Sequence, residues 1–400
     1  MMFHEDIADK IADKELAAAV RSVQKLTDGE YDLYNQNEAV IMKLLKKILR
    51  LSKKEEEWYL YFYTLYELMY EAVRCGDNPT VVKYAEVYYK DCDLYMDKAL
   101  PNYSQTRMTY MNTWTYEQIF SAYFQYHQIN DAKMDAFMKK FEKAALKYGK
   151  TAGYYECELE LGVLYRDSDM LEHGKKNFER YEHEITGCYV CSRKPLFGYY
   201  LCNGQRKTAE EFYETIVQKR IPKQHRWCYE YCEAAEADDL CAYLLQTGLR
   251  LCRPEEFRYF YEKYWLKLPE KKRKGEFKTV YIFADAIAEN WGQMREDLHE
   301  AENDVAESMK NTTVDNIEFG LMWWCYFALL DKSGVHEVAI DLPGLAPKEN
   351  GKTDCRDIST YFEKRADEYG MKFAQARAKY DYGLMKRTYR ECAGLYGKLD

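Results

Sequence analysis

Stretches of helical periodicity, each closed by a tight break, recur along most of this chain and limit what it can fold into. Apolar residues fall at three- and four-residue spacings, and no alternating run typical of a strand of any length occurs. Helix pairs that recur at intervals of roughly 30 to 45 residues are typical of solenoids, in which each pair buries its apolar face against its neighbours. The sequence therefore predicts an all-α fold, an α-solenoid of stacked antiparallel helix pairs.

The same pattern gives approximate bounds for the expected helices. They span 55–76, 78–96, 105–128, 131–148, 154–166, 170–185, 195–202, 209–217, 226–237, 239–251, 276–291, 295–309 and 315–330.

Two glycines and two aromatic residues stand at fixed offsets within one of these pairs. Tyr165 comes three residues after Gly162, Gly174 comes twelve after it, and Phe178 stands four beyond Gly174. Because glycine has no side chain, Gly162 would let the second helix approach closely, and Gly174 would be the small contact on that helix. Tyr165 and Phe178 would then fill the space between this pair and the next.

These offsets resemble a tetratricopeptide repeat, clearly over about 155–222 and more weakly over about 55–330. Glu158 and Tyr181 depart from the pattern, where the family has tryptophan and alanine. The next unit repeats the spacing with Gly198, Leu201, Ala209 and Tyr213. The chain is similar to bacterial tetratricopeptide-repeat proteins, a resemblance that implies a superhelix with a concave groove but carries over no single activity.

The organisation expected along the chain is one continuous solenoid. N-terminal helices would occupy 1–53, helical repeats 54–330, a long surface loop 331–356 and a C-terminal capping helix 357–400. The loop contains glycines, two prolines and a short apolar alternation, so we expect a surface excursion with one short extended piece.

Charge and local motifs exclude several classes of function. A formal charge of −9 argues against a general nucleic-acid binder, which needs a basic surface. No apolar run approaches the length of a membrane helix, and the start lacks the basic region of a signal peptide, so we expect a cytoplasmic protein with no membrane partner. Phosphate-binding and nucleophile-elbow motifs do not occur in the sequence, which favours a protein without enzymatic activity. An enzymatic role would require a pocket that no motif predicts.

Two pairs of metal-ligand residues stand near the starts of neighbouring repeats. Cys188 and Cys191 form a C-x-x-C, and His225 and Cys228 form an H-x-x-C. Equivalent edges of stacked pairs adjoin, so the four side chains could converge on one zinc ion with tetrahedral ligation. The alternative is that they are ordinary thiols, since the chain has thirteen cysteines and Cys232 stands nearby in helical text. A redox role for the C-x-x-C is disfavoured because the βαβ context is missing.

The concave groove would be the remaining functional surface. The function expected is a cytosolic scaffold that binds a peptide or protein partner there; the alternative is a peptide-responsive sensor that passes a change to another protein through the long loop. The partner, the pathway and the oligomeric state are left open. The groove residues expected from the repeat register are Gln118, Gln125, Glu156, Leu159, Val163, Arg166 and Tyr199.

Overall fold

The computed structural model describes residues 7–27, 37–99, 105–184, 188–232, 235–268, 278–288, 313–340 and 342–395. These residues are almost entirely helical and form two compact units. Unit 1 comprises Met1–Phe124 and Lys139–Lys150, and unit 2 comprises Gln125–Met138 and Thr151–Asp400. No helix among the described residues is both long enough and apolar enough to cross a membrane.

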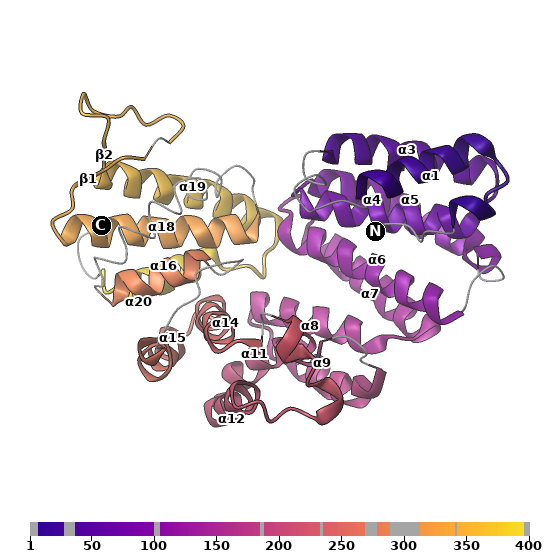
Figure 1. Cartoon of the computed structure of the whole chain (residues 1–400). Coiled ribbons are helices and arrows are strands. Elements are labelled where there is room, and N and C mark those ends of the chain that lie inside the picture. The colour runs from indigo at the N-terminus through magenta and orange to yellow at the C-terminus, as the bar shows by residue number, and fades with distance from the viewer. Residues whose placement is uncertain are drawn as a thin grey trace. The chain divides into compact units, whose positions relative to one another are not determined.

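Unit 1 is built from consecutive helices, and α1 packs on α3, α3 on α4 and α4 on α5 (Figure 1). The glycine at position 76 ends the α4 region with a positive φ of 69°, which glycine adopts without strain. Leu45, Leu65, Met69 and Val81 are fully buried between these helices. The helices of unit 1 are α1 (Lys14–Thr27), α3 (Glu38–Lys54), α4 (Trp58–Arg74), α5 (Asn78–Ala99), α6 (Gln105–Gln125) and the later part of α7 (Asp131–Tyr148).

Unit 2 also consists of helices that pack on their sequence neighbours, such as α8 on α9 and α14 on α15. Its helices are α8 (Thr151–Tyr165), α9 (Ser168–Tyr181), α10 (Tyr189–Arg193), α11 (Pro195–Cys202), α12 (Arg206–Val217), α13 (Cys228–Tyr231), α14 (Ala237–Arg250), α15 (Pro254–Lys263), α16 (Lys278–Ile287), α18 (Val314–Lys332), α19 (Cys355–Ala376) and α20 (Tyr382–Cys392).

The glycine offsets act as predicted within the α8–α9 pair. A methyl group at Gly162 would meet Leu171 of α9 at 2.9 Å, and one at Gly174 would meet Leu159 of α8 at 3.1 Å. At Gly198 on α11 it would overlap Val163 of α8. Each glycine therefore lets two helices approach more closely than any larger residue allows. Packing between successive helices is thus established, whereas a continuous superhelix stays a prediction.

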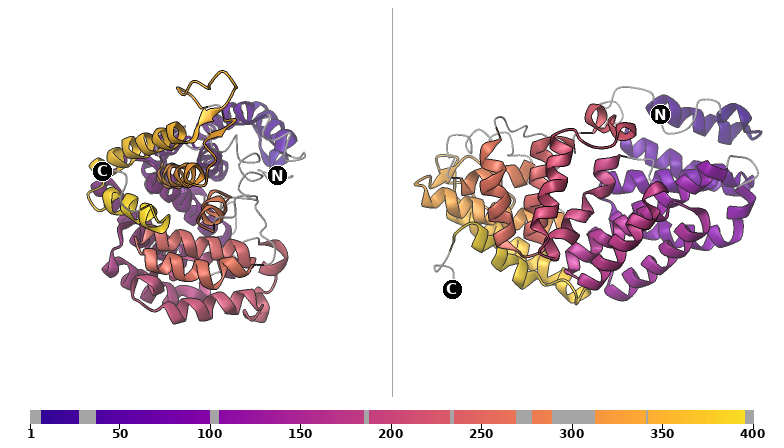
Figure 2. Two further views of the ribbon diagram at one scale, coloured as in Figure 1. Left: turned by 90° about the vertical axis from the view of Figure 1, so that its left-hand side faces the viewer. Right: turned by 90° about the horizontal axis from the view of Figure 1, so that it is seen from below.

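Helix α18 forms the interior of the C-terminal part of unit 2. It packs along α19 and α16 (Figure 2), and every residue from Gly320 to Phe327, more than two turns of the helix, is buried. A helix that is apolar all round is buried in this way. The following loop contains the predicted extended piece: β1 (Glu337–Val338) pairs antiparallel with β2 (Thr353–Asp354), and the segment between them projects away from α19 (Figure 1).

Three helix predictions differ from the structure. The helix expected over 226–237 is reduced to α13, because Cys232 takes an extended conformation with φ −128° and ψ 107°. Helices α10 and α15 were not predicted. The single C-terminal helix is instead two, α19 and α20, with the second capped by the side chain of Asp381. The helix expected over 295–309 lies outside the described residues.

Candidate functional site

Two very short helices of unit 2 carry four cysteines. Cys188 is the N-cap of α10, and Cys191 lies in its first turn. Cys228 begins α13, and Cys232 ends it, with its backbone N–H donating to the carbonyl oxygen of Cys228. Each pair is therefore held within about one helical turn, so both side chains of a pair can reach the same point.

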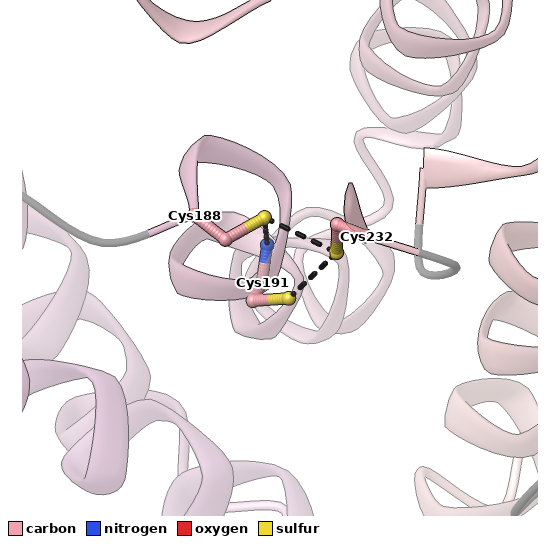
Figure 3. Close-up of side chains that lie close together, drawn as sticks. All are labelled: Cys188, Cys191 and Cys232. Carbon is pink, nitrogen blue, oxygen red and sulfur yellow. Dashed lines mark hydrogen bonds between the residues drawn. The ribbon is translucent and has the colours of Figure 1, made fainter. Parts of the chain in front are cut away.

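Three of these sulfur atoms converge from the two helices, and the fourth, that of Cys228, lies close to one of them. The Sγ atom of Cys232 lies 3.3 Å from that of Cys188 and 3.3 Å from that of Cys191. All three lie within 4.8 Å of one another (Figure 3). The Sγ atom of Cys228 lies 3.5 Å from that of Cys188. The two segments are about 40 residues apart in sequence, so the cluster is a tertiary feature.

Backbone amides point at two of these sulfurs. The N–H of Cys191 donates to Sγ of Cys188 at 3.4 Å, and the N–H of Tyr189 donates to Sγ of Cys228 at 3.3 Å. Such bonds favour sulfur in its negatively charged form. Hydrogen bonds with the thiols of Cys188 and Cys232 raise the pKa of the Cys191 thiol far above its ordinary value. Cys228 is buried and Cys191 is exposed, so solvent reaches the cluster from one side.

The structure changes the ligand set that the sequence suggested. Cys188, Cys191 and Cys228 lie in the cluster, but His225 is packed against the ring of Tyr189, with ring centroids 5.1 Å apart. Cys232 takes its place among the sulfurs. The signal for it was the C-x3-C spacing of Cys228 and Cys232, which places both residues on one face of a helical turn.

The predicted groove residues of unit 2 belong mainly to its interior. Leu159, Val163 and Tyr199 are buried, the first two against glycines of adjacent helices. The hydroxyl of Tyr199 donates to Glu172 at 2.8 Å. Glu156 is half-buried on α8. Leu159, Val163 and Tyr199 therefore contribute to packing, and a role for them in partner binding stays a prediction that their burial weighs against.

Arg166 and Gln125 join a polar network around Arg250. Arg250 donates to Glu318 at 2.7 Å and to Asp315 at 2.9 Å. Gln125 donates to Asp315 at 2.7 Å, and Arg166 donates to the carbonyl oxygen of Arg250 at 3.4 Å. Because these polar groups satisfy one another, the network holds helices of unit 2 together.

Unit 1 presents a different candidate surface, an aromatic stripe formed by Tyr63, Tyr66 and Tyr70 of α4 and Trp114 of α6. Ring centroids along the stripe lie 6.2 Å (Tyr63 to Tyr66), 6.1 Å (Tyr66 to Tyr70) and 6.3 Å (Tyr66 to Trp114) apart. Tyr70 is 42% exposed and Trp114 48% exposed. Gln118, the predicted groove residue in unit 1, is half-buried and stands one turn beyond Trp114 on α6.

The surroundings of the stripe are acidic. Burial raises the pKa of Tyr66 well above its ordinary value, and the neighbouring side chains of Glu67, Tyr70, Glu117 and Glu71 raise it further. This surface was not predicted from the sequence, because the expected groove residues follow the repeat register. The three-four spacing of Tyr63, Tyr66 and Tyr70 was the available signal.

Comparisons of the chain with protein-family models, with curated proteins and with solved structures found no match. The tetratricopeptide-repeat resemblance therefore stays a prediction, carried by the residues around Gly162 and Gly198.

Proposed function

We propose that this chain is a non-catalytic helical scaffold that binds a basic segment of a peptide or protein on the aromatic stripe of unit 1. The observation that carries the proposal is the exposure of Tyr70 and Trp114 beside a central ring, Tyr66. Exposed patches of large apolar residues mark interaction sites more often than isolated ones do. Tryptophan and tyrosine also dominate the binding energy of protein interfaces.

The charge around the stripe and of the whole chain favours a partner with basic residues. The faces of aromatic rings attract cations, and the half-buried carboxylate of Glu117 near Tyr66 adds to that attraction. The chain as a whole carries a formal charge of −9, which favours association with a basic partner. A lysine or arginine side chain lying across the rings, with Gln118 available to a backbone amide, is the contact that this chemistry favours.

The test is selection of ligands from a random peptide library on the intact protein, followed by affinity measurement with variants. We expect the selected peptides to be rich in lysine or arginine and to bind more weakly as salt rises. Trp114→Ala and Tyr70→Ala should each weaken binding about tenfold or more, as loss of an interface anchor does. Both side chains are exposed, so neither change should unfold the chain.

Trp227→Ala is the matched control, because Trp227 is 40% exposed and lies outside the stripe. It should leave the affinity unchanged. Selection of acidic or uncharged peptides, or binding that neither Trp114→Ala nor Tyr70→Ala weakens, would refute the proposal.

A further inference from the structure

We infer that Cys188, Cys191, Cys228 and Cys232 bind one zinc ion through four thiolates and so join α10 to α13. This site is in unit 2 and does not depend on the peptide-binding proposal.

The sulfur geometry suits a single tetrahedral ion. With zinc–sulfur bonds of about 2.3 Å, tetrahedral ligation places sulfur atoms about 3.8 Å apart. The separations between Cys232 and Cys188, Cys232 and Cys191, and Cys188 and Cys228 are 3.3, 3.3 and 3.5 Å. An outward shift of a few tenths of an ångström at Cys188, Cys191 and Cys232 would open room for the ion. Cys228 lies outside this group of three, close to Cys188 alone, so its side chain must rotate toward the others to supply the fourth ligand. Since side-chain rotation alone provides such a shift, the backbone of α10 and α13 can stay in place.

The donor set selects the kind of metal. Four sulfur ligands are typical of closed structural zinc sites, whereas calcium and magnesium require oxygen ligands. The amide groups of Cys191 and Tyr189 donate to sulfurs of the cluster, an arrangement that orients and stabilises thiolate ligands. Four thiolate ligands leave no open coordination position on the ion, so the site would be structural and not catalytic. The exposed side of Cys191 gives the ion a path to the site.

Helices α10 and α13 are also too short to be stable alone, and a metal ion would hold them together. Helices α10 and α13 have only five and four residues, far fewer than the number needed for an isolated helix to be stable. A zinc ion held between them would fix two segments that stand about 40 residues apart in sequence. Its binding energy would then contribute directly to the stability of this part of unit 2.

The first experiment is native mass spectrometry and elemental analysis of the full-length protein, purified under reducing conditions without added metal. We expect one zinc per chain, released by a strong chelator and regained on addition of zinc. The reduced, metal-depleted chain should also bind cobalt(II) and show the intense visible absorption of tetrahedral thiolate ligation, a readout that does not depend on any activity.

Variants separate this ligand set from the alternatives. Cys191→Ser and Cys232→Ser should each weaken zinc binding more than about 100-fold, since loss of a direct ligand exceeds the effect of losing a supporting group. Cys75→Ser, at an exposed cysteine of unit 1, and His225→Ala should both retain the ion. Circular dichroism of each variant would show that the helices are intact, and cobalt titration of the unmodified chain gives the result even if one variant fails to fold.

Several results would overturn the inference. Failure of the reduced chain to bind either zinc or cobalt would refute it, and so would tight binding of iron in place of zinc. Loss of the ion in His225→Ala with retention in Cys232→Ser would assign the site to the sequence-predicted ligands instead. A mass lower by two hydrogens in the chain isolated without reductant, together with no metal bound after reduction, would show that two cysteines form a disulfide instead.

Discussion

Glu67 shows how a single residue of α4 links burial to pH-dependent stability. Its side chain lies inside unit 1, and burial raises its pKa to about 8, while a hydrogen bond with Tyr63 opposes the rise and Glu71 adds to it. In the unfolded chain Glu67 releases its proton near pH 4.5, the usual pKa of glutamate. Between about pH 4.5 and about pH 8, therefore, only the folded chain keeps Glu67 protonated. The free energy of unfolding should therefore fall as pH rises from about 4.5 to about 8.

Glu67→Gln tests this expectation, because glutamine resembles the protonated acid and does not ionise. In the variant, the free energy of unfolding should fall much less between about pH 4.5 and about pH 8 than in the unchanged chain. The difference between the two should be at most about 5 kcal/mol. Denaturant unfolding measured at several pH values would show it. Glu349→Gln, which removes an exposed carboxylate, should keep the slope of the unchanged chain. Parallel curves for the unchanged chain and Glu67→Gln would contradict the expectation.

At the same scale, the cysteine cluster shows what sequence could and could not predict. The C-x-x-C of Cys188 and Cys191 was recognised as half of a site, because its spacing is local. The other half was predicted as His225 with Cys228, and Cys232 was read as an ordinary thiol, although Cys228 with Cys232 is also a plausible chelating pair. In the structure His225 packs against Tyr189, whereas Cys232 lies 3.3 Å from the sulfurs of Cys188 and Cys191, and no local pattern encodes these contacts.

At the scale of elements, the crossing of α19 and α20 depends on one glycine. A methyl group at Gly370 would overlap the ring of Tyr382, whose hydroxyl donates to Asp367 at 2.7 Å. Gly370→Ala should therefore lower the free energy of unfolding by about 1–3 kcal/mol, the usual cost of overpacking. Urea denaturation measures the change.

Gly383→Ala is the matched control for Gly370→Ala. Gly383 is also in a helix, is exposed on α20, and a methyl group there would meet neighbouring atoms only at 3.6 Å. Alanine should leave stability unchanged or raise it by up to about 1 kcal/mol, because alanine favours helix more than glycine does. Equal losses in the two variants would mean that the close approach of α19 and α20 does not limit stability.

The helices themselves were largely predictable, because apolar periodicity and caps act within a few residues. The bounds predicted for α7 and α11 match the structure, and the glycine contacts of α8 and α9 were foreseen. Failures occur where a distant contact decides the backbone. The break between α19 and α20 follows Arg377, which donates to the carbonyl oxygen of Ile129 at 2.9 Å. Nothing in the neighbouring sequence indicates that contact.

At the scale of the whole molecule, the described chain divides into two units where the sequence predicted one continuous solenoid. One boundary between the units falls within α7: residues 125–138 belong to unit 2, and Lys139–Lys150 belongs to unit 1. Because α7 runs through the division without a proline, a glycine or a change in composition, no sequence signal marks it. Residues 126–131 of this segment are hydrogen-bonded to residues of unit 2 about 250 positions later.

Arg377 provides the test of that assignment. Its guanidinium is fully buried and donates to the carbonyl oxygens of Ile129 and Tyr126, while the backbone N–H of Ala378 donates to Asp131 at 2.8 Å. Arg377→Met keeps the apolar stem but leaves these carbonyl groups without their donor, so unit 2 should lose about 2–4 kcal/mol of stability.

Hydrogen exchange gives the decisive readout for Arg377→Met. The backbone amides of 126–131 should exchange faster in this variant than in the unchanged chain. Without the hydrogen bonds from the guanidinium, less free energy is needed to open this segment. Arg387→Met removes an exposed arginine of α20 and should leave both exchange and stability unchanged. If exchange over 126–131 stayed the same in Arg377→Met, the segment would be held in unit 2 by its apolar contacts, such as those of the buried Met134, and not by the arginine.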